Sequence, residues 1–289
     1  MKIDLGNTFA SKNITQSSQS LYERNLKRLN DGNEIKNFHF LKDKEVILGK
    51  LEKYKPNTRR TYIISIVSLM KCLIESNPTN KQYKKLYSLY YSVLDEMNTN
   101  LKTANEKTDK EKENWISQEE VMEKLADLKT KVTTANISLS KKKKLTEVEF
   151  DILRNYLILS LYALQKPRRN RDYQDMIVVS SSKKIAEEMT SNVVDLKENN
   201  FIFNNFKTKK TYQSQNIPIS VKLREIIDLY LKHHPTYKPT ATNPVQLLVN
   251  FAGVPFTKNN DMTRMLYKIF GEKKVGVNML RHIFLTDKF

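Results

Sequence analysis

Three basic side chains stand where predicted structural elements end or begin, and their types suit work on a phosphate group. Arg169 follows a long apolar stretch that stops at Pro167, Lys207 follows a short apolar strand, and Arg281 lies near the start of the last apolar helix. A guanidinium group can fork onto two phosphate oxygens, and a lysine ammonium can donate a proton to a leaving oxygen. These residues therefore point to phosphate chemistry.

Other kinds of catalytic site find little support in the sequence. His39, His233, His234 and His282 share no ligand spacing, so we expect neither a metal site nor a cofactor. No phosphate-binding or dinucleotide-binding glycine motif occurs, and six glycines in total leave little room for one. The single cysteine, Cys72, excludes an intrachain disulfide and lies on an apolar helical face, where we expect it to belong to a core.

The charge balance predicts a polyanionic partner. Lys and Arg number 50 against 32 Asp and Glu, which leaves a formal net charge of +18. Charge alone does not separate DNA, RNA and an anionic membrane, but a membrane fits least well because no segment combines a basic face with a large exposed apolar face. No apolar run approaches the roughly 20 residues that span a bilayer, and the N-terminus has no signal-peptide pattern. We therefore expect a soluble, intracellular protein.

The elements that must position the basic residues divide into two predicted domains. Apolar residues recur at helical spacing from about residue 15 to residue 98, and Asn57 or Thr58 is expected to cap one of these helices. Residues 98–114 lose this spacing and become polar and charged, which is typical of a linker. The sequence thus predicts a helical domain over residues 1–105, a linker over 106–115 and a second domain over 116–289.

Two capping boxes are expected to open the second domain. Ser117 with Glu120, and Thr146 with Glu149, have the spacing at which a hydroxyl and a carboxylate cap the same helix start. The helix after the second box is apolar nearly all round as far as residue 164, so it should be central and buried.

Short strands are expected between residues 192 and 220. Asn199 marks one turn, the polar stretch after residue 207 marks the next, and Pro218 suggests an edge strand. Residues 247–249 form a further extended piece, and helices are expected to start near residues 220, 261 and 278. The predicted fold is mainly α with one small antiparallel β-sheet.

Three segments carry a family resemblance. PRRNRDY at residues 167–173, FNNFKTKKTY at 203–212 and NMLRHIFLT at 278–286 follow one another as the catalytic elements of tyrosine recombinases do. The chain resembles this family of DNA breaking and rejoining enzymes, which includes phage integrases. SLYERNLKRLN and KPNTRRTYIISIVSLMK resemble its SAM-like core-binding domain, and KENWISQEEV with PRRNRDY is most similar to versions from virophages, large DNA viruses and related mobile elements.

The resemblance covers nearly the whole chain and implies a function. That function is site-specific DNA recombination or integration through a 3′-phosphotyrosyl intermediate. Double-stranded DNA would be the substrate, and the protein would form a homo-oligomer, a dimer or tetramer, on that DNA. The resemblance implies no metal and no other cofactor.

The resemblance also implies a role for each matching residue. Arg169 falls on the family's first arginine, with Asp172 as the acidic residue that braces it, and Arg281 falls on the second arginine. The two arginines would clamp the scissile phosphate, while Lys207 would protonate the departing 5′ oxygen. Register leaves neighbouring basic residues as alternatives, namely Arg168 and Arg171 for the first arginine, and Lys209 and Lys210 for the lysine.

Two departures from the family pattern concern catalysis. Asn278 stands where the family usually has His or Lys; it can donate a hydrogen bond but does not shuttle a proton near neutral pH, and His282 is a candidate to compensate. The family's nucleophilic tyrosine lies some tens of residues after the second arginine, but the last tyrosine here is Tyr267. The sequence is therefore expected to be cut inside its catalytic domain, so that the chain binds DNA without forming the phosphotyrosyl link.

Two readings of a different class stay open. One is a non-catalytic DNA- or RNA-binding protein that keeps the recombinase fold, and the other is a helical scaffold whose charge only confers solubility. Further candidate DNA contacts, each of which could instead be a solvated surface residue, are Arg59, Arg60, Lys141, Lys142, Lys143, Lys144, Lys209 and Lys210.

Overall fold

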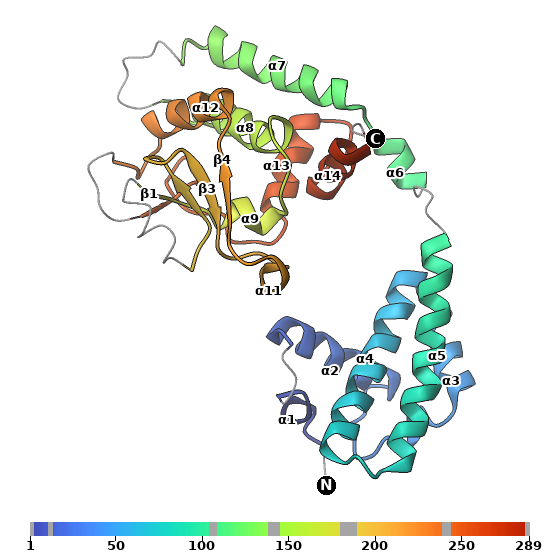
Figure 1. The fold of residues 1–289 in the computed structure, drawn as a ribbon. Coiled ribbons are helices and arrows are strands. Elements are labelled where there is room, and N and C mark those ends of the chain that lie inside the picture. The colour runs from blue at the N-terminus through green and yellow to red at the C-terminus, as the bar shows by residue number, and fades with distance from the viewer. Residues whose placement is uncertain are drawn as a thin grey trace. The chain divides into compact units, whose positions relative to one another are not determined.

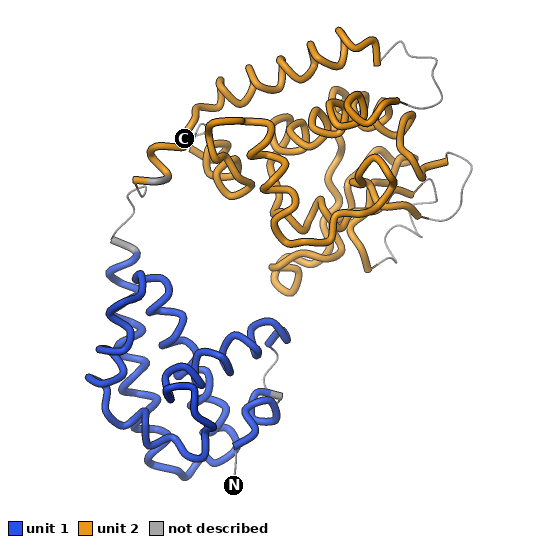
Figure 2. Tube along the Cα trace, turned by 180° about the vertical axis from the view of Figure 1, so that it is seen from behind, with its two compact units in different colours: residues 1–106 blue, residues 107–289 orange. Residues whose placement is uncertain are grey.

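The computed structural model describes residues 3–10, 14–103, 109–137, 145–179, 190–238 and 244–286. The chain forms two compact units, unit 1 over residues 1–106 and unit 2 over residues 107–289 (Figure 2). The described part of unit 1 is helical, whereas unit 2 combines helices with one sheet (Figure 1). None of the described helices is long and apolar enough to cross a membrane.

Unit 1 is built around helix α4, which packs against α2 and α5. Cys72 is fully buried in the unit 1 core, as predicted. Lys55 is the N-cap of α4 and Pro56 its first residue, so the prediction that Asn57 or Thr58 would cap this helix is wrong. Proline suits the first helical position because its missing N–H would have had no partner there. The elements are α1 (Leu5–Ala10), α2 (Gln16–Leu29), the 3-10 helix η1 (His39–Leu41), α3 (Lys44–Leu51), α4 (Pro56–Ser76) and α5 (Lys81–Thr103).

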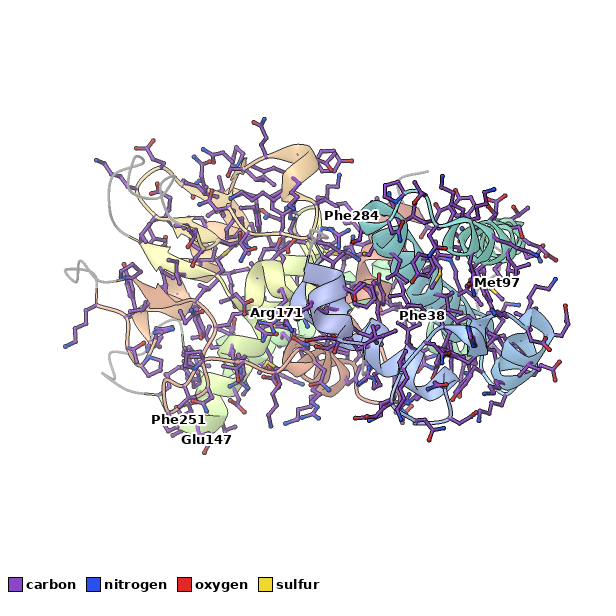
Figure 3. All side chains as sticks on the ribbon, turned by 90° about the horizontal axis from the view of Figure 1, so that it is seen from below. Phe38, Met97, Glu147, Arg171, Phe251 and Phe284 are labelled. Carbon is purple, nitrogen blue, oxygen red and sulfur yellow. The ribbon has the colours of Figure 1, made fainter. Side chains whose placement is uncertain are left out.

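Unit 2 is organised around helix α8, which is buried nearly all round as predicted and packs against α7, α12, α13 and α14. Phe150 near its start contacts the ring of Phe251 at a centroid distance of 6.1 Å. Figure 3 shows Phe251 and Glu147 at this same end of α8. The helices are α6 (Asp109–Asn114), α7 (Gln118–Thr134), α8 (Glu147–Ala163), α9 (Asn170–Gln174), α11 (Lys209–Tyr212), α12 (Val221–Lys232), α13 (Asp261–Phe270) and α14 (Val277–Thr286).

Part of the predicted linker is helical and joins unit 2. The Lys274 N–H donates to Asn114 Oδ1 at 2.7 Å, and Lys273 Nζ donates to the Glu113 carbonyl at 2.8 Å. These two bonds fasten α6 to the segment between α13 and α14.

Both predicted capping boxes are confirmed. The Ser117 hydroxyl accepts the Glu120 N–H at 3.1 Å, and the Glu120 carboxylate accepts the Ser117 N–H at 2.7 Å. Thr146 and Glu149 make the same reciprocal pair at the start of α8. A short polar motif thus fixes where the central helix begins.

Replacing Thr146 with Ala is expected to lower the free energy of unfolding of unit 2 by about 1 kcal/mol, because the Glu149 N–H loses its acceptor. Urea unfolding followed by the fluorescence of Trp115, the single tryptophan, measures this change. Thr133→Ala is the control, since that exposed hydroxyl only donates back to the Lys129 carbonyl within α7. An equal loss in both variants would contradict the capping role.

The sheet of unit 2 is mixed, so the prediction of a purely antiparallel sheet is wrong. The strands are β1 (Ile177–Val179), β2 (Val193–Asp195), β3 (Asn200–Phe203), β4 (Gln215–Pro218) and β5 (Val245–Gln246), in the order β4-β3-β2-β1-β5. The β2–β3–β4 antiparallel meander, its turn at Asn199 and the edge position of Pro218 are as predicted. However, β1 pairs with β2 in parallel and with β5 antiparallel. A three-residue apolar strand directly after a helix has no alternating pattern by which sequence could reveal it.

Candidate functional site

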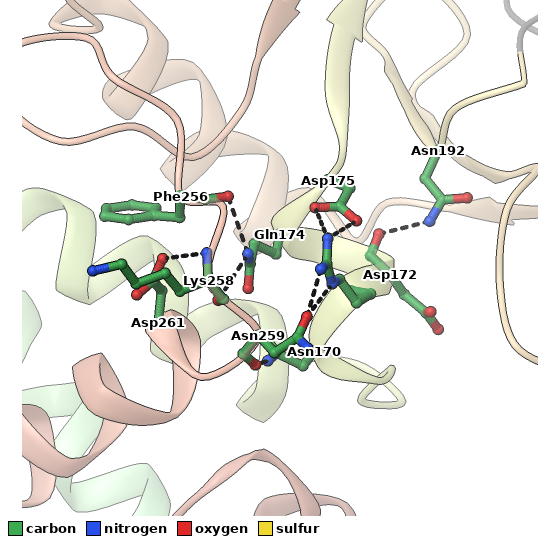
Figure 4. A network of polar contacts seen from close by, with 10 residues as sticks. Asn170, Asp172, Gln174, Asp175, Asn192, Phe256, Lys258, Asn259 and Asp261 are labelled. Carbon is green, nitrogen blue, oxygen red and sulfur yellow. Dashed lines mark hydrogen bonds and ion pairs between the residues drawn. The ribbon is translucent and has the colours of Figure 1, made fainter. Parts of the chain in front are cut away.

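Asp172 organises the turn that follows the central helix. It is the third residue of α9 and is 2% exposed, and its Oδ2 accepts the Arg169 N–H at 3.3 Å. The same oxygen lies 3.3 Å from Arg168 Nε. The Asp172 carbonyl in turn accepts Nδ2–H of Asn192, which precedes β2, at 2.9 Å (Figure 4). Asp172 thus ties the start of α9 to the sheet.

The side chain braced by Asp172 is that of Arg168, which corrects the expectation that Asp172 braces the Arg169 side chain. The Arg168 guanidinium lies 4.2 Å from the Phe203 ring centroid and 5.0 Å from that of Phe206. Its Nη1 donates to Gln215 Oε1 at 2.7 Å. The Arg168 guanidinium thus contacts two aromatic rings and Gln215 while it pairs with the Asp172 carboxylate. Arg168 therefore holds α9 against β3 and β4.

The Arg171 side chain also has partners within the protein. Its Nη1 lies 3.0 Å from Asp175 Oδ2, and its Nε donates to Asn259 Oδ1 at 3.0 Å; both partners are labelled in Figure 4. Gln174 Nε2 donates to the Phe256 carbonyl at 3.0 Å, so α9 is pinned to the segment that precedes α13. Of the three arginines in this turn, only Arg169 has a guanidinium without a hydrogen bond or ion pair to a described residue.

Arg281 on α14 faces the same turn. Burial lowers its pKa, and the positive charges of Arg169 and Arg168 lower it further, against the opposing effects of Asp172 and Tyr162. Arg281 is half-buried, and among the described residues its guanidinium, like that of Arg169, has no hydrogen bond or ion pair. Two guanidinium groups from distant segments therefore interact electrostatically, and Asp172 is the carboxylate whose charge acts on both.

This arrangement favours a bound anion. Like charges within a few ångströms repel, more strongly when they are partly withdrawn from water. Asp172 is already shared between Arg168 and the Arg169 backbone, and burial is the main reason why its own pKa is raised. An oxyanion that bridged Arg169 and Arg281 would relieve the repulsion and accept charge-assisted hydrogen bonds from both.

Two buried tyrosines, Tyr162 and Tyr173, interact electrostatically with the arginines, and the sequence did not suggest a role for them. The rings of Tyr162 and Tyr173 meet edge to face at 5.5 Å, and Tyr173 also contacts Phe203. Burial raises the pKa of both phenols, most strongly that of Tyr162, so both stay protonated. The only signal was a tyrosine within an otherwise apolar helix.

The predicted lysines lie on the connection between β3 and β4. Lys207 is exposed in the turn before α11, and Lys209 and Lys210 are exposed on α11 itself. The connection is longer than a tight hairpin turn because α11 interrupts it. Lys207 does not take part in the electrostatic interactions recorded for Arg281.

Asn278 and His282 line a different hollow from the arginine pair. They are one turn apart on α14 and border a cavity of about 240 Å³ together with Trp115, Thr263 and Tyr267. Arg281 does not line this cavity. The structure therefore brings together Arg169, Arg281 and Asp172, and separates Asn278 and His282 from them.

Of the remaining predicted DNA contacts, the two arginines form hydrogen bonds within unit 1 and the four lysines lie outside the described residues. Arg59 donates through Nε to the Tyr54 carbonyl at 2.6 Å and through Nη2 to the Glu52 carbonyl, where it closes the end of α3. Arg60 Nε donates to Asn98 Oδ1 at 2.5 Å and joins α4 to α5. Lys141, Lys142, Lys143 and Lys144 lie outside the described residues.

Comparison of the chain with protein-family models, with curated proteins and with solved structures gives no match. No group of three or more His, Cys, Asp or Glu side chains in the described part of the chain is placed to hold a metal ion. The assignment of function therefore depends on the charge, the sequence motifs and the geometry of unit 2.

Proposed function

We propose that this chain is the DNA-binding part of a tyrosine-type site-specific recombinase or integrase. One observation carries the proposal: Arg169 and Arg281, both half-buried, interact electrostatically with each other and with Asp172, and neither guanidinium forms a hydrogen bond or ion pair with a described residue. These are the two residues that the motif resemblance assigns to the scissile phosphate. A chain of net charge +18 also has the cations needed to follow a DNA backbone on either side of that phosphate.

In this proposal the two guanidinium groups hold the non-bridging oxygens of one phosphodiester. The tyrosine that the resemblance implies, for which residues 282–289 offer no candidate, loses its phenolic proton to water as its oxygen attacks the phosphorus. The bond to the 5′ oxygen breaks, and that oxygen takes a proton from Lys207. Arg169 and Arg281 stabilise the extra negative charge on phosphorus during the transfer. Arg168 and Asp172 are positioning residues, because they hold the turn that presents Arg169. Duplex DNA is the proposed partner, on which copies of the chain assemble.

Fluorescence anisotropy of a labelled duplex at several salt concentrations tests this proposal. Arg169→Ala and Arg281→Ala are each expected to weaken binding about 10- to 100-fold, because each removes a charge-assisted contact of about 1.5–3 kcal/mol. Each variant should also reduce the slope of log affinity against log salt by about 0.9, as one phosphate contact is lost.

The control is Lys129→Ala, which removes one positive charge from an exposed position on α7. It should leave affinity and salt slope nearly unchanged. If all three variants weaken binding equally, the chain is responding to net charge and the arginine pair is no specific phosphate site.

A non-catalytic nucleic-acid binder is the second candidate, and the placement of Asn278 and His282 favours it. These residues border a cavity that Arg281 does not line, and neither side chain hydrogen-bonds to the described Arg169 or Arg281 side chains. A nicked suicide duplex, incubated with the protein encoded by the complete reading frame, separates the candidates, because residues 282–289 include no tyrosine. A covalent protein–DNA adduct that is lost in Arg281→Ala would identify the enzyme, whereas tight binding without an adduct would identify the binder.

A further inference from the structure

A second basic hollow lies in unit 1, where helix α2 meets the start of α4. Its volume is about 380 Å³, which is within the usual range for ligand pockets. The lining contains two arginines, several hydroxyl and amide side chains and two tyrosines, but no carboxylate. The residues that matter below are Arg24, Arg28, Tyr54, Asn57, Thr58 and Tyr62.

The two arginines share one face of α2. Arg24 and Arg28 are four residues apart, a spacing at which like charges repel and slightly destabilise a helix. Neither forms an ion pair with a carboxylate in the described part of the chain. A neighbouring hollow of about 70 Å³ is also lined by Arg28 and Tyr62 and adds Lys53, together with Asp31, which pairs with Lys50 at 2.7 Å. Both arginines also border a hollow on another side of α2 that contains Asp4, Glu23 and Glu34, but no carboxylate lines the hollow between α2 and α4.

The start of α4 supplies hydrogen-bond donors to the same hollow. Lys55, the N-cap, offers no side-chain acceptor, and Pro56 has no N–H. The next residues, Asn57 and Thr58, both line the hollow. The N-terminus of a helix of this length carries partial positive charge, which suits an anion. Because the Thr58 N–H already donates to the Lys55 carbonyl at 2.8 Å, the Asn57 N–H is the donor that the first turn offers.

Tyr62 provides the observation that points to a ligand. Its side chain is 3% exposed, and its buried hydroxyl makes no hydrogen bond of normal geometry to a described residue. The ring stacks on Tyr54 at a centroid distance of 5.1 Å, so the hydroxyl is held in place where the two hollows meet. The hydroxyl interacts with Tyr54 and Arg28, and no carboxylate lines this hollow, so an anion bound here would meet a hydroxyl group beside two cations.

The electrostatic surroundings of Tyr62 also favour negative charge at this position. Burial alone would raise the pKa of Tyr62, but interactions with Tyr54 and Arg28 and the charges of Arg28 and Lys53 bring it below its ordinary value. The local field therefore stabilises negative charge at this point of unit 1.

We propose that Arg24, Arg28, Tyr62 and the first turn of α4 form a phosphate-binding pocket that takes a backbone phosphate of nucleic acid. This pocket is independent of Arg169 and Arg281, which belong to unit 2. It also replaces Arg59 and Arg60 as the phosphate contacts of this unit, since those side chains are used on the Glu52 and Tyr54 carbonyls and on Asn98.

The test uses the whole chain and three ligands: inorganic phosphate, a nucleoside monophosphate and a duplex. Amide chemical shifts of Asn57 and Thr58 report occupation of the pocket directly. Duplex affinity is then compared for the double variant Arg24→Gln/Arg28→Gln, for Tyr62→Phe and for the control Lys27→Gln. Lys27 is an exposed cation on the same helix that does not line the pocket.

We expect phosphate to shift both amides and the double variant to weaken duplex binding at least about tenfold, with a salt slope reduced by about 0.9 to 1.8. Tyr62→Phe should weaken it several-fold and Lys27→Gln hardly at all. A double variant that matches Lys27→Gln in duplex affinity would overturn the assignment to a nucleic-acid backbone. If phosphate or the monophosphate still shifts the amides in that case, the pocket belongs to a free phosphate compound. Amides that respond to none of the three ligands would overturn the pocket itself.

Two comparisons keep the result interpretable. Thermal unfolding of unit 1 should be the same in Tyr62→Phe and the parent protein, because only one unpaired hydroxyl is removed. The variants Arg169→Ala and Arg281→Ala should still show the phosphate-induced shifts of Asn57 and Thr58. Failure of the unit 2 site would therefore not be mistaken for failure of this one.

Discussion

Asp172→Ala is expected to lower the free energy of unfolding of unit 2 by about 3–5 kcal/mol. The carboxylate is almost fully buried and Arg168 is 15% exposed, so removing the acid leaves a cation confined between two phenylalanine rings. The Arg169 N–H loses its acceptor at the same time. The measurement is urea unfolding followed by the fluorescence of Trp115, which lies in unit 2.

Two further variants separate the buried pair from other effects. Asp175→Ala removes a carboxylate whose pair with Arg171 is about half exposed, and it should cost about 0–1 kcal/mol. Asp172→Asn keeps an oxygen for the Arg169 N–H and should fall between the two alanine variants. A loss in Asp172→Ala no larger than that in Asp175→Ala would mean that Arg168 does not depend on Asp172.

Acid should destabilise unit 2 through His234. This side chain is 6% exposed, and its Nδ1 accepts the N–H groups of Tyr237 at 3.0 Å and Thr236 at 3.3 Å. Burial is the main cause that lowers the pKa of His234 to about 4, against an ordinary value of 6.5. The unfolded chain therefore binds the proton more readily than the folded one does between these two values.

The sign of the effect follows from this difference. The contribution of His234 is complete above about pH 6.5 and is lost as the pH falls towards 4, to a total of about 3 kcal/mol. Chemical unfolding at several pH values between 4 and 7.5 measures the loss. His234→Asn, which keeps an acceptor near the Nδ1 position, should flatten this part of the profile.

His39→Asn is the matched control, because that imidazole is exposed and lies in unit 1. It should leave the transition of unit 2 unchanged at every pH. The parent protein and His234→Asn could instead lose the same free energy of unfolding as the pH falls. That result would mean that groups other than the buried His234 cause the acid sensitivity.

Local features were predictable because they depend on residues three or four apart. The boxes at Ser117 and Thr146 form as expected. The helix expected near residue 220 begins at Val221, after Ser220, whose hydroxyl accepts the Leu223 N–H. The meander β2–β3–β4 was also readable, since each turn joins strands that are neighbours in the chain. In contrast, the parallel pairing of Ile177–Val179 with β2 is non-local, and only the folded chain reveals it.

The candidate site, too, was predictable from the sequence only in part. Sequence order singled out Arg169, Arg281 and Asp172 as residues for one site, but it paired the carboxylate with the wrong side chain. The choice between Arg168 and Arg169 depends on the rings of Phe203 and Phe206, which β3 and the chain beyond it bring beneath Arg168. Spacing along α9 places both arginines near Asp172 and does not distinguish their directions.

The sequence by itself determined the excess of positive charge, the starts of the capped helices and the small set of cations that could meet a phosphate. Only the tertiary structure decided which cations already have partners. Arg168 and Arg171 pair with carboxylates, and Arg59 and Arg60 donate to neutral oxygens. In the described part of the chain, Arg169, Arg281, Arg24 and Arg28 form no ion pair. The physical reason is that charge is a property of each residue, while neutralisation depends on distances across the fold that sequence spacing does not set.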